Sequence, residues 1–497
     1  MTSAFYIRTS DIILLNKLME YLLIIGAIFG IGYFFGKSKD KKSAPPTYTP
    51  LTHNEEPPKK SQINVEREDV DYIKLSLEQE KVFNLLEETN SNYYITGKAG
   101  TGKSMLLEYF VRNSQKRVAV VAPTGVAALN VGGQTIHSFF KLPPALIEKG
   151  DVTRVDYKTK EVLANLDAVV IDEISMVRVD LMEAISEKLK LARRNELPFG
   201  GAQIIMFGDL YQLPPVVSDG QLHRYFDHNY GGIYFFNSPA YKESDAKILE
   251  LNHIFRQKDE EFKKLLNAVR NGKLSAEILE KFNERTEVKI PDEGLITLAG
   301  RNDTVSRINH TKLASLPGDE KTYVADIFGD LKDSAFPTEK YLRLKVGAQI
   351  MMLKNDRQKP SRWVNGTLGV ITKLSDNTII VKINGVEHSV SKETWDSVRY
   401  FYNPEERKLD KETVSSFTQF PIRLAWAITI HKSQGQTYQS IAIDLSDGAF
   451  AHGQTYVALS RCQSLEGLYL TSPLKSEDII VDQDVVEFMK SVEIISE

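Results

Sequence analysis

Apolar residues gather in short runs along residues 75–250, and segments with helical spacing of apolar residues lie between those runs. Residues 179–191 show that spacing clearly. The apolar runs are rich in β-branched side chains and lie at 93–96, 118–122, 168–171 and 204–207. Continuous apolar strands separated by helices are typical of a parallel sheet with both faces covered. The pattern therefore predicts an α/β domain, whose first helix begins at the capping box Ser76-Leu77-Glu78-Gln79.

A second α/β region is predicted from about residue 251, with strands at 295–298, 349–353 and 441–444. The hydropathy pattern changes inside this region, because β-rich runs of alternating polarity occupy residues 367–390. Asp376-Asn377 and Asn384-Gly385 interrupt these runs, and an Asn-Gly pair is a strong hairpin signal. We therefore expect a small antiparallel β module inserted into the second α/β domain.

The first 70 residues differ from the rest of the chain. Residues 21–36 carry no charge, and four of the next six residues are lysine (Lys37, Lys39, Lys41 and Lys42). Such a segment is marginally long enough to cross a bilayer, and the lysines would leave the remaining chain on the cytoplasmic face. We expect a transmembrane segment within 1–36 and a proline-rich linker over 37–70. A buried N-terminal helix and a true start at Met19 are the alternative interpretations, and a cytoplasmic protein is the alternative location.

The charge balance and the cysteine count exclude some classes of protein. The 497 residues include 62 Lys and Arg and 66 Asp and Glu, which gives a net charge of −4. This balance excludes a uniformly basic nucleic-acid coat protein, but it is compatible with a local basic groove, because net charge averages over every face. The single cysteine, Cys462, excludes a disulfide framework and argues against a cysteine zinc site.

Candidate chemistry begins at the end of the first apolar run, where residues 97–104 read GKAGTGKS. This matches the phosphate-binding loop G-x-x-x-x-G-K-[ST] in its usual place between a strand and a helix. In such a loop, backbone N–H groups and the helix N-terminus surround phosphates, Lys103 reaches the β- and γ-phosphates, and Ser104 binds Mg²⁺. The predicted nucleotide-binding residues of the loop are Gly97, Ala99, Gly100, Thr101, Gly102, Lys103 and Ser104.

Two acidic residues, Asp172 and Glu173, follow the third apolar run. Asp172 at the end of a strand can hold Mg²⁺, and Glu173 can orient and deprotonate the attacking water. Alone, an Asp-Glu pair is usually a solvated surface feature. Downstream of a phosphate-binding loop, the pair indicates hydrolysis of ATP or GTP.

Further segments carry hydroxyls, amides, His, Lys and aromatic residues, which suit contacts with phosphates, sugars and bases. With the acidic pair they read APTGVAALNVGGQTIHSFF from Ala122, IDEISM from Ile171, FGDLYQLPP from Phe207, LAWAITIHKSQGQT from Leu424 and YVALSR from Tyr456. In this order they resemble superfamily-one DNA helicases of the Pif/RecD-like family, over roughly residues 75–470. The resemblance implies two RecA-like P-loop motor domains with ATP between them, single-stranded DNA across both, and a small SH3-like β insert. The implied boundaries are 71–250 for the first motor, 251–366 and 416–497 for the second, and 367–415 for the insert.

The same resemblance implies roles for individual residues. Gln79 matches an adenine-reading glutamine, and its place in the capping box explains it equally well. Gln212 matches a glutamine that senses the γ-phosphate, and Arg256 and Arg461 match arginines that reach this phosphate from the second motor. Gly435 joins the nucleotide-binding set. The implied catalytic residues are Lys103, Asp172, Glu173, Gln212, Arg256 and Arg461, and the implied nucleic-acid contacts are Thr124, His137, Ser138, His431, Lys432 and Ser433.

The implied function is an ATP-dependent DNA helicase that uses ATP and Mg²⁺, moves 5′ to 3′ on single-stranded DNA and unwinds tailed duplex DNA. Repair, recombination and replication are the processes expected of the family. Two alternatives stay open. A membrane-tethered, nucleic-acid-stimulated ATPase would remodel DNA–protein or RNA–protein complexes without net unwinding. RNA is an alternative substrate, because segments that contact the backbone carry no base code and discrimination of the 2′-OH is not readable from one sequence.

Overall fold

The computed structural model describes residues 74–217, 219–291, 294–331, 333, 336–358, 361–406 and 408–495 of the chain. The predicted membrane segment within 1–36 and the predicted linker over 37–70 lie outside these residues. Within the part of the chain that the structure describes, no helix combines the length and the apolar character that a bilayer crossing requires.

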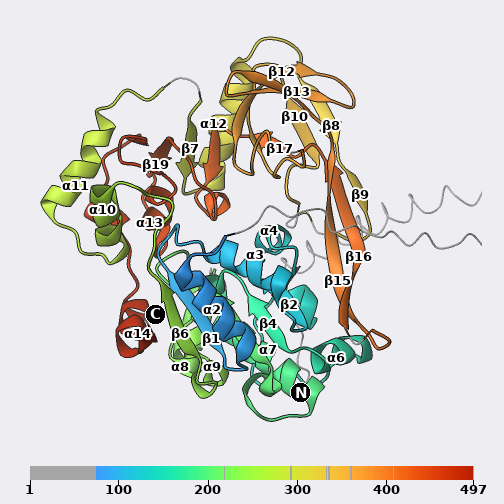
Figure 1. The fold of residues 1–497 in the computed structure, drawn as a ribbon. Coiled ribbons are helices and arrows are strands. Elements are labelled where there is room, and N and C mark those ends of the chain that lie inside the picture. Colours follow the sequence, from blue (N-terminus) through green and yellow to red (C-terminus); the bar gives the residue numbers. More distant parts are fainter. Residues whose placement is uncertain are drawn as a thin grey trace, which may run out of the picture. The chain divides into compact units, whose positions relative to one another are not determined.

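A seven-stranded parallel sheet forms the first half of the described chain, with strand order β21-β6-β1-β5-β4-β2-β3 (Figure 1). Its strands are β1 (Tyr93–Gly97), β2 (Val118–Ala122), β3 (Gln134–Thr135), β4 (Ala168–Ile171), β5 (Gln203–Phe207), β6 (Lys247–Leu251) and β21 (Ile494–Ile495). The four apolar runs therefore form parallel strands, as predicted. The strand β21 comes from the range that was predicted for the second motor, and it pairs with β6 at the edge of this first sheet.

The core of this half explains why its strands read as continuous apolar runs. Val169 and Ile171 of β4 belong to one buried cluster, whereas Ala168 and Val170 belong to another. Successive side chains of a strand point to opposite faces, so both faces of the sheet are buried. The helices of this half are α2 (Leu77–Glu88), α3 (Lys103–Asn113), α4 (Gly125–Asn130), α5 (Ile136–Phe140), α6 (Tyr157–Ala164), α7 (Val179–Arg193), α8 (Gly220–Tyr230) and α9 (Pro239–Glu243).

The second half has a four-stranded parallel sheet of order β18-β7-β19-β20. Its strands are β7 (Ile296–Ala299), β18 (Ala427–Thr429), β19 (Ile441–Asp444) and β20 (Leu468–Leu470). The helices of this half are α10 (Glu260–Arg270), α11 (Ala276–Asn283), α12 (Asn302–Ser315) and α13 (Gln454–Leu459). Helix α14 (Gln483–Ser491) packs on the first half, where its Phe488 ring stacks on Phe236 with the ring centroids 4.1 Å apart. The predicted strands at 295–298 and 441–444 thus correspond to β7 and β19.

Antiparallel strands interrupt this second half over a wider stretch than the predicted insert at 367–415. They form two-, three- and five-stranded sheets. The strands are β8 (Lys321–Val324), β9 (Asp326–Phe328), β10 (Tyr341–Leu344), β11 (Gln349–Met352), β12 (Leu368–Leu374), β13 (Ile379–Ile383), β14 (Val386–Val390), β15 (Glu393–Asn403), β16 (Lys408–Gln419) and β17 (Ile422–Leu424). The predicted hairpin at Asn384-Gly385 is confirmed, since both residues have positive φ and join β13 to β14.

One predicted strand lies in a different sheet from the one expected. The run at 349–353 was assigned to the second α/β sheet, but β11 pairs antiparallel with β12 and β17. The physical reason is that β11 is buried along its whole length. A fully buried strand has the same continuous apolar run in either kind of sheet, so its hydropathy does not identify its partners.

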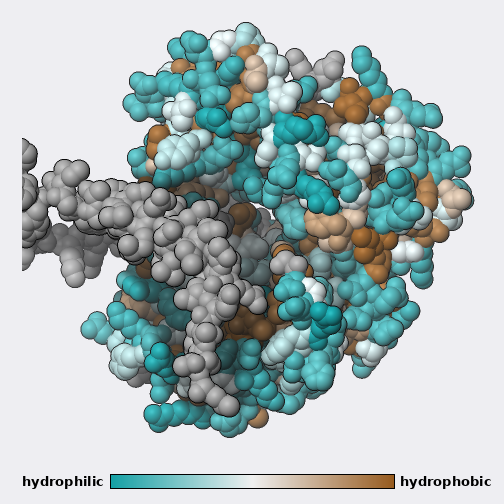
Figure 2. Space-filling model, turned by 180° about the vertical axis from the view of Figure 1, so that it is seen from behind, coloured by the Kyte–Doolittle hydropathy of each residue, from teal (hydrophilic) through white to brown (hydrophobic). Residues whose placement is uncertain are grey.

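The long hairpin of β15 and β16 extends from the inserted strands to the first half (Figure 1). The Tyr400 hydroxyl on β15 accepts a hydrogen bond of 3.1 Å from the backbone N–H of Val120 in β2. Lys411 on β16 donates to the Gly132 carbonyl at 2.6 Å. The hairpin therefore ties the inserted strands to the edge of the first sheet. Hydrophilic residues dominate the face of the molecule shown in Figure 2, and hydrophobic residues form smaller patches on it.

Candidate nucleotide and nucleic-acid sites

The phosphate-binding loop lies at the carboxyl end of β1, where β1 ends at Gly97 and α3 begins at Lys103. Gly100 and Gly102 have φ values of 85° and 80°, a region that favours glycine. A Cβ atom at Gly102 would collide with the Gln79 side chain, and one at Gly100 would collide with Arg256. The glycines therefore allow the loop to pack closely between α2 and the segment that enters the second half.

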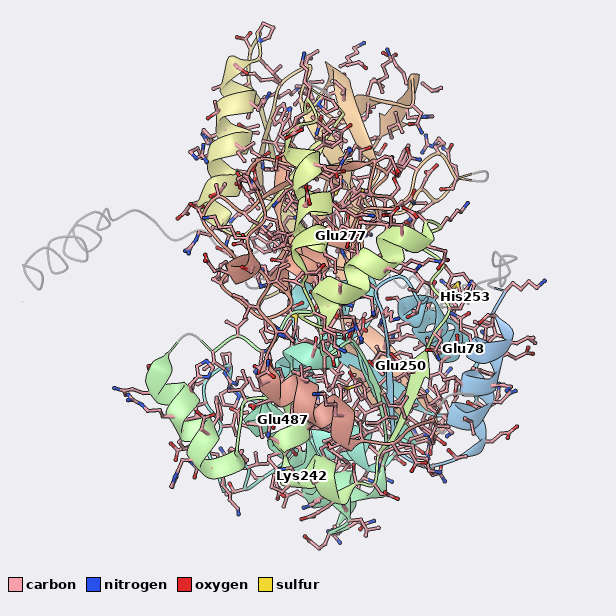
Figure 3. All side chains as sticks on the ribbon, turned by 90° about the vertical axis from the view of Figure 1, so that its left-hand side faces the viewer. Glu78, Lys242, Glu250, His253, Glu277 and Glu487 are labelled. Carbon is pink, nitrogen blue, oxygen red and sulfur yellow. The ribbon has the colours of Figure 1, made fainter. Side chains whose placement is uncertain are left out.

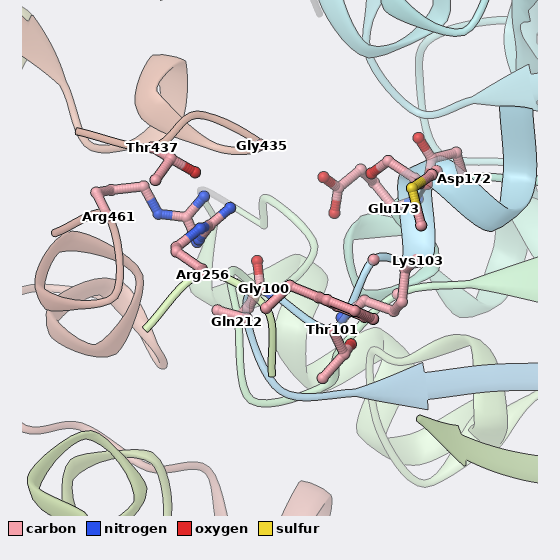
Figure 4. A pocket seen from close by; sticks show the side chains of 16 residues that line it. Gly100, Thr101, Lys103, Asp172, Glu173, Gln212, Arg256, Gly435, Thr437 and Arg461 are labelled. Carbon is pink, nitrogen blue, oxygen red and sulfur yellow. Dashed lines mark hydrogen bonds between the residues drawn. The ribbon is translucent and has the colours of Figure 1, made fainter. Parts of the chain in front are cut away.

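A cavity of about 330 Å³ opens beside this loop (Figure 4). Strands β1, β4 and β5 all end at it, because the carboxyl ends of parallel strands meet at one edge of a sheet. The second half closes the opposite side with residues that follow β6, β18 and α13. The lining contains all six predicted catalytic residues: Lys103, Asp172, Glu173, Gln212, Arg256 and Arg461. It also contains Ala99, Gly100, Thr101, Gly102, Ser104 and Gly435 from the predicted nucleotide-binding set, but not Gln79 or Gly97.

Lys103 is folded back onto its own loop. Its Nζ donates to the carbonyl oxygens of Gly97 at 2.6 Å and Lys98 at 3.1 Å. Burial lowers the pKa of Lys103 to about 8, against the opposing effect of the nearby Asp209 and Glu173 carboxylates. A phosphate oxygen would be a stronger partner for this ammonium group than the two carbonyls are.

Arg256 and Arg461 face the loop from the second half. Arg256 Nη1 donates to the Ser460 carbonyl at 3.1 Å, and Arg461 Nε donates to the Val457 carbonyl at 3.0 Å. Burial, with the positive charge of Arg461 adding to it, lowers the pKa of Arg256 to about 9. Burial also lowers the pKa of Arg461. A partly buried guanidinium group at Arg256 and a fully buried one at Arg461, each held by a neutral carbonyl oxygen, create a site that suits a polyanion.

Asp172 and Glu173 lie opposite these cations (Figure 4). Burial raises the pKa of Asp172 to about 6, and burial together with the charge of Asp172 raises the pKa of Glu173 to about 8. Glu173 has a left-handed backbone, with φ of 51° and ψ of 47°, which is rare for a residue with a side chain. A divalent cation beside the pair would offset the cost of burying negative charge.

The donor set therefore fits Mg²⁺. Ser104 supplies a hydroxyl and Asp172 supplies a carboxylate, and Mg²⁺ prefers such oxygen ligands together with substrate phosphates. Within the described residues, no group of three or more His, Cys, Asp or Glu side chains forms a separate metal cluster.

The loop that carries Gln212 is connected to the second half by a buried ion pair. Gln212 Nε2 donates to Asp209 Oδ2 at 3.4 Å, and Asp209 Oδ1 accepts from Arg270 of α10 at 3.0 Å. The Arg270 guanidinium also lies 4.0 Å from the ring centroid of Tyr211. A movement of α10 relative to the first sheet would therefore displace Asp209 and, through Asp209, Gln212.

Gln79 lies behind the phosphate-binding loop. Its Nε2 donates to the Gly102 carbonyl at 3.4 Å, and its Oε1 accepts from the Ser76 N–H at 3.0 Å, which completes the capping box. The neighbouring Glu78 accepts from the backbone N–H groups of Asn252 and His253 at 2.8 and 3.4 Å (Figure 3). Helix α2 is thus bound both to the loop and to the segment that leads into the second half.

A second cavity, of about 340 Å³, lies between α4 of the first half and the residues after β18. Thr124, His431 and Lys432 of the predicted nucleic-acid set line it. His137 and Ser138 lie on α5, outside its lining. Ser433 is fully buried, and its hydroxyl donates to the Ile430 carbonyl at 2.7 Å. The structure therefore brings three of the six predicted residues together at this cavity.

Several lining residues escaped the sequence reasoning. Phe255 and Thr437 line the first cavity, and Trp395, Arg423 and Gln434 line the second. Phe255 and Gln434 are direct neighbours of recognised positions, so their sequence offered a signal. Trp395 lies on β15 of the inserted strands, far along the chain from any recognised segment, and its sequence offered none.

Comparisons with known proteins agree with this arrangement. A family model described as PIF1-like helicase matches residues 74–280, and one described as DNA helicase Pif1, 2B domain matches residues 330–374. The ATP-dependent DNA helicase Pif1 of Bdellovibrio bacteriovorus is 34% identical over 436 residues, covering 85% of this chain and 93% of that protein. Some relatives are longer, since the match spans 61% of the rat protein.

Solved structures agree as well. The Bacteroides sp Pif1 in complex with ADP-AlF4 has a TM-score of 0.77 and 37% identity, covering 84% of this chain and 97% of that chain. The Bacteroides Pif1 bound to ssDNA has a TM-score of 0.62 and 38% identity, with the same coverage. The match to the Bdellovibrio protein covers nearly the whole length of that protein at 34% identity, which establishes that the two proteins belong to one family. The chain belongs to the PIF1-like helicase family.

Proposed function

We propose that this chain is an ATP-dependent DNA helicase that translocates 5′ to 3′ on single-stranded DNA and separates tailed duplexes. The observation that carries the proposal is the shared lining of the first cavity. Lys103, Asp172 and Glu173 come from the first half, and Arg256 and Arg461 come from the second. Since both halves must contribute for the site to be complete, each cycle of nucleotide binding and release would close and open the gap between them.

The geometry of the first cavity supports the residue roles that the resemblance implies. Lys103 exchanges its carbonyl partners for phosphate oxygens, and Ser104 and Asp172 hold Mg²⁺, which supplies charge neutralisation when it is bound. Glu173 takes the proton from the attacking water. Arg256 and Arg461 stabilise negative charge that develops in the transition state. Gln212 reports the state of the site to α10 through Asp209 and Arg270.

The second cavity is the proposed track for the nucleic-acid strand. Thr124 comes from the first half, and His431 and Lys432 come from the second. A strand held by both halves would be pulled along when the gap between them changes. Relatives that are named as DNA helicases, and a relative whose structure was solved with bound ssDNA, support DNA as the strand.

We propose the two-motor division at 71–250, 251–366 and 416–497, with an SH3-like module at 367–415. The two parallel sheets support the two motors, whereas β21 pairs with the first sheet and the antiparallel strands extend beyond 367–415 on both sides, over 321–424. We also propose, on the sequence pattern alone, that residues 1–36 tether the protein to a membrane. Carbonate washing of membranes from cells that express the full chain tests the tether, since release of the protein into the wash would contradict it.

ATPase measurements test the proposed activity. Wild-type protein should hydrolyse ATP faster when single-stranded DNA is added, and Lys103→Ala should abolish turnover in both conditions, because no other charged side chain of the loop lines the cavity. Hydrolysis retained by Lys103→Ala would refute the nucleotide-site assignment. Single-stranded RNA of the same length, added in a parallel reaction, distinguishes DNA from RNA as the activating strand.

A further inference from the structure

The two cavities share one residue. Glu173 lines both the nucleotide cavity and the second cavity, where the strand is proposed to bind. On the second-cavity side, Gln434 from the second half donates its Nε2 hydrogen to Glu173 Oε2 at 3.0 Å. This hydrogen bond joins the proposed water-activating carboxylate to the loop that carries His431 and Lys432.

Glu173 is bound by a hydrogen-bond donor, whereas Lys103 and Arg256 are bound by hydrogen-bond acceptors. Lys103 and Arg256 are held by carbonyl oxygens, and phosphate oxygens can replace such acceptors because they are stronger. Glu173 is held by an amide donor. A phosphate anion repels a carboxylate and offers it no hydrogen, so the phosphates themselves do not replace Gln434 as the hydrogen-bond partner of Glu173.

The loop that carries Gln434 can instead be moved from the side of the second cavity. Gln434 directly follows the short 3-10 turn His431–Ser433, and His431, Lys432 and Gln434 all line the second cavity. Gly435, the next residue, has φ of 77°, a conformation that glycine adopts without strain. A strand that contacts the two basic side chains therefore acts on the backbone next to Gln434.

The same loop is tied to the nucleotide site from its other side. Arg461 Nη1 donates to the carbonyl oxygens of Ser433 at 3.5 Å and Gln436 at 3.4 Å. The loop thus contacts both a proposed transition-state arginine and the proposed base. A displacement of this loop would change the surroundings of both groups at once.

We propose that Gln434 is a positioning residue that restrains Glu173 until a nucleic-acid strand fills the second cavity and draws the amide away. This inference rests on the proposed function and adds to it the contact through which the strand stimulates hydrolysis. In the resting protein the carboxylate is engaged by an amide and is poorly placed to accept a proton from water. With the strand bound, Glu173 is released toward the nucleotide.

The experiment compares the steady-state ATPase of wild-type, Gln434→Ala and Gln439→Ala protein, as full chains. Each is measured with saturating MgATP, without DNA and with saturating oligo-dT. Gln439 is an exposed glutamine five residues along that lines neither cavity, so it is a matched control. The hydrogen bond from Gln434 restrains Glu173, so its loss in Gln434→Ala should raise the DNA-free kcat on the order of tenfold. The DNA-stimulated kcat should stay near that of wild type, and the control should match wild type throughout.

Gln434→Leu supplies a second variant, because leucine keeps much of the volume of glutamine but has no N–H to donate to Glu173, so it should raise the DNA-free rate as well. It replaces Gln434→Ala in the comparison if the alanine variant has a lower melting temperature than wild type. An unchanged or lowered DNA-free kcat in a folded variant would overturn the inference, since a merely structural or orienting role produces no gain. Wild-type protein that shows no stimulation by oligo-dT would overturn the proposed function, whereas a stimulated wild type with an equally stimulated Gln434→Ala overturns the inference alone.

Discussion

The ion pair between Asp209 and Arg270 offers a quantitative test of how the two halves are joined. Asp209 Oδ1 lies 3.0 Å from Arg270 Nη2, and the two side chains are 0% and 7% exposed. Burial alone would raise the pKa of Asp209, but the charges of Arg270 and Lys103 outweigh it and hold the pKa below its usual value. The carboxylate is therefore ionised and depends on Arg270 for its charge compensation.

Replacing Arg270 with methionine keeps most of the side-chain volume and leaves a buried carboxylate without its main partner. Breaking a buried pair on one side costs about 3–5 kcal/mol. Asp209→Asn should cost a similar amount, because it leaves the guanidinium uncompensated. The double variant should cost clearly less than the sum of the two, since neither charge is then left alone.

Urea unfolding of wild type, both single variants and the double variant gives the four free energies that this cycle needs. The cost of Asp209→Asn should shrink as the pH falls below about 4, since a group with a lowered pKa stabilises the fold above its unfolded pKa of about 3.9 and loses that contribution on protonation. A single variant that costs less than about 1 kcal/mol, the range of exposed pairs, would refute the reasoning, and so would simple additivity in the double variant.

Further predictions concern catalysis, the strand and packing. Arg461→Lys should lower the DNA-stimulated kcat by roughly 10³-fold or more, because a lysine lacks the planar fork, and a change below about tenfold would argue against a role at the phosphate. ATPase kcat/KM should rise with pH until about 8, where Glu173 becomes ionised in the free protein, and a flat profile from pH 6 to 9 would contradict its role as base. Lys432→Ala should reduce the slope of log DNA affinity against log NaCl concentration by about one, and an unchanged slope would mean that Lys432 does not contact a phosphate. Tyr400→Phe leaves the backbone N–H of Val120 without its partner and should cost about 1–3 kcal/mol in urea unfolding, with no loss meaning that the contact is unimportant.

Much of the parallel architecture was predictable because its signals are local. Strands such as β4 are buried on both faces and therefore read as apolar runs. The loop after β1 needs glycine for its positive φ values, which makes it recognisable in sequence. The six predicted catalytic residues lie in segments with recognisable sequence patterns, and the fold brings all six together at one cavity.

The remaining features depend on contacts between distant residues. The sheet to which β11 belongs is decided by its partners β12 and β17, which its own hydropathy does not specify. The pairing of β21 with β6 joins residues about 250 positions apart. Gln434 stood inside a recognised segment, but its contact with Glu173 is visible only in three dimensions. Residues 1–70 received predictions that lie outside the described part of the chain.

Strand separation is the measurement that tests the central claim most directly. The full-length protein is incubated with MgATP and matched duplexes that carry a single-stranded tail at either the 5′ or the 3′ end of one strand, with Lys103→Ala as the inactive control. The account predicts ATP-dependent separation of the 5′-tailed duplex and little separation of the 3′-tailed one. Separation of the 3′-tailed duplex alone would contradict the direction of movement. No separation of either duplex, by protein whose ATPase is stimulated by DNA, would contradict the assignment as a helicase.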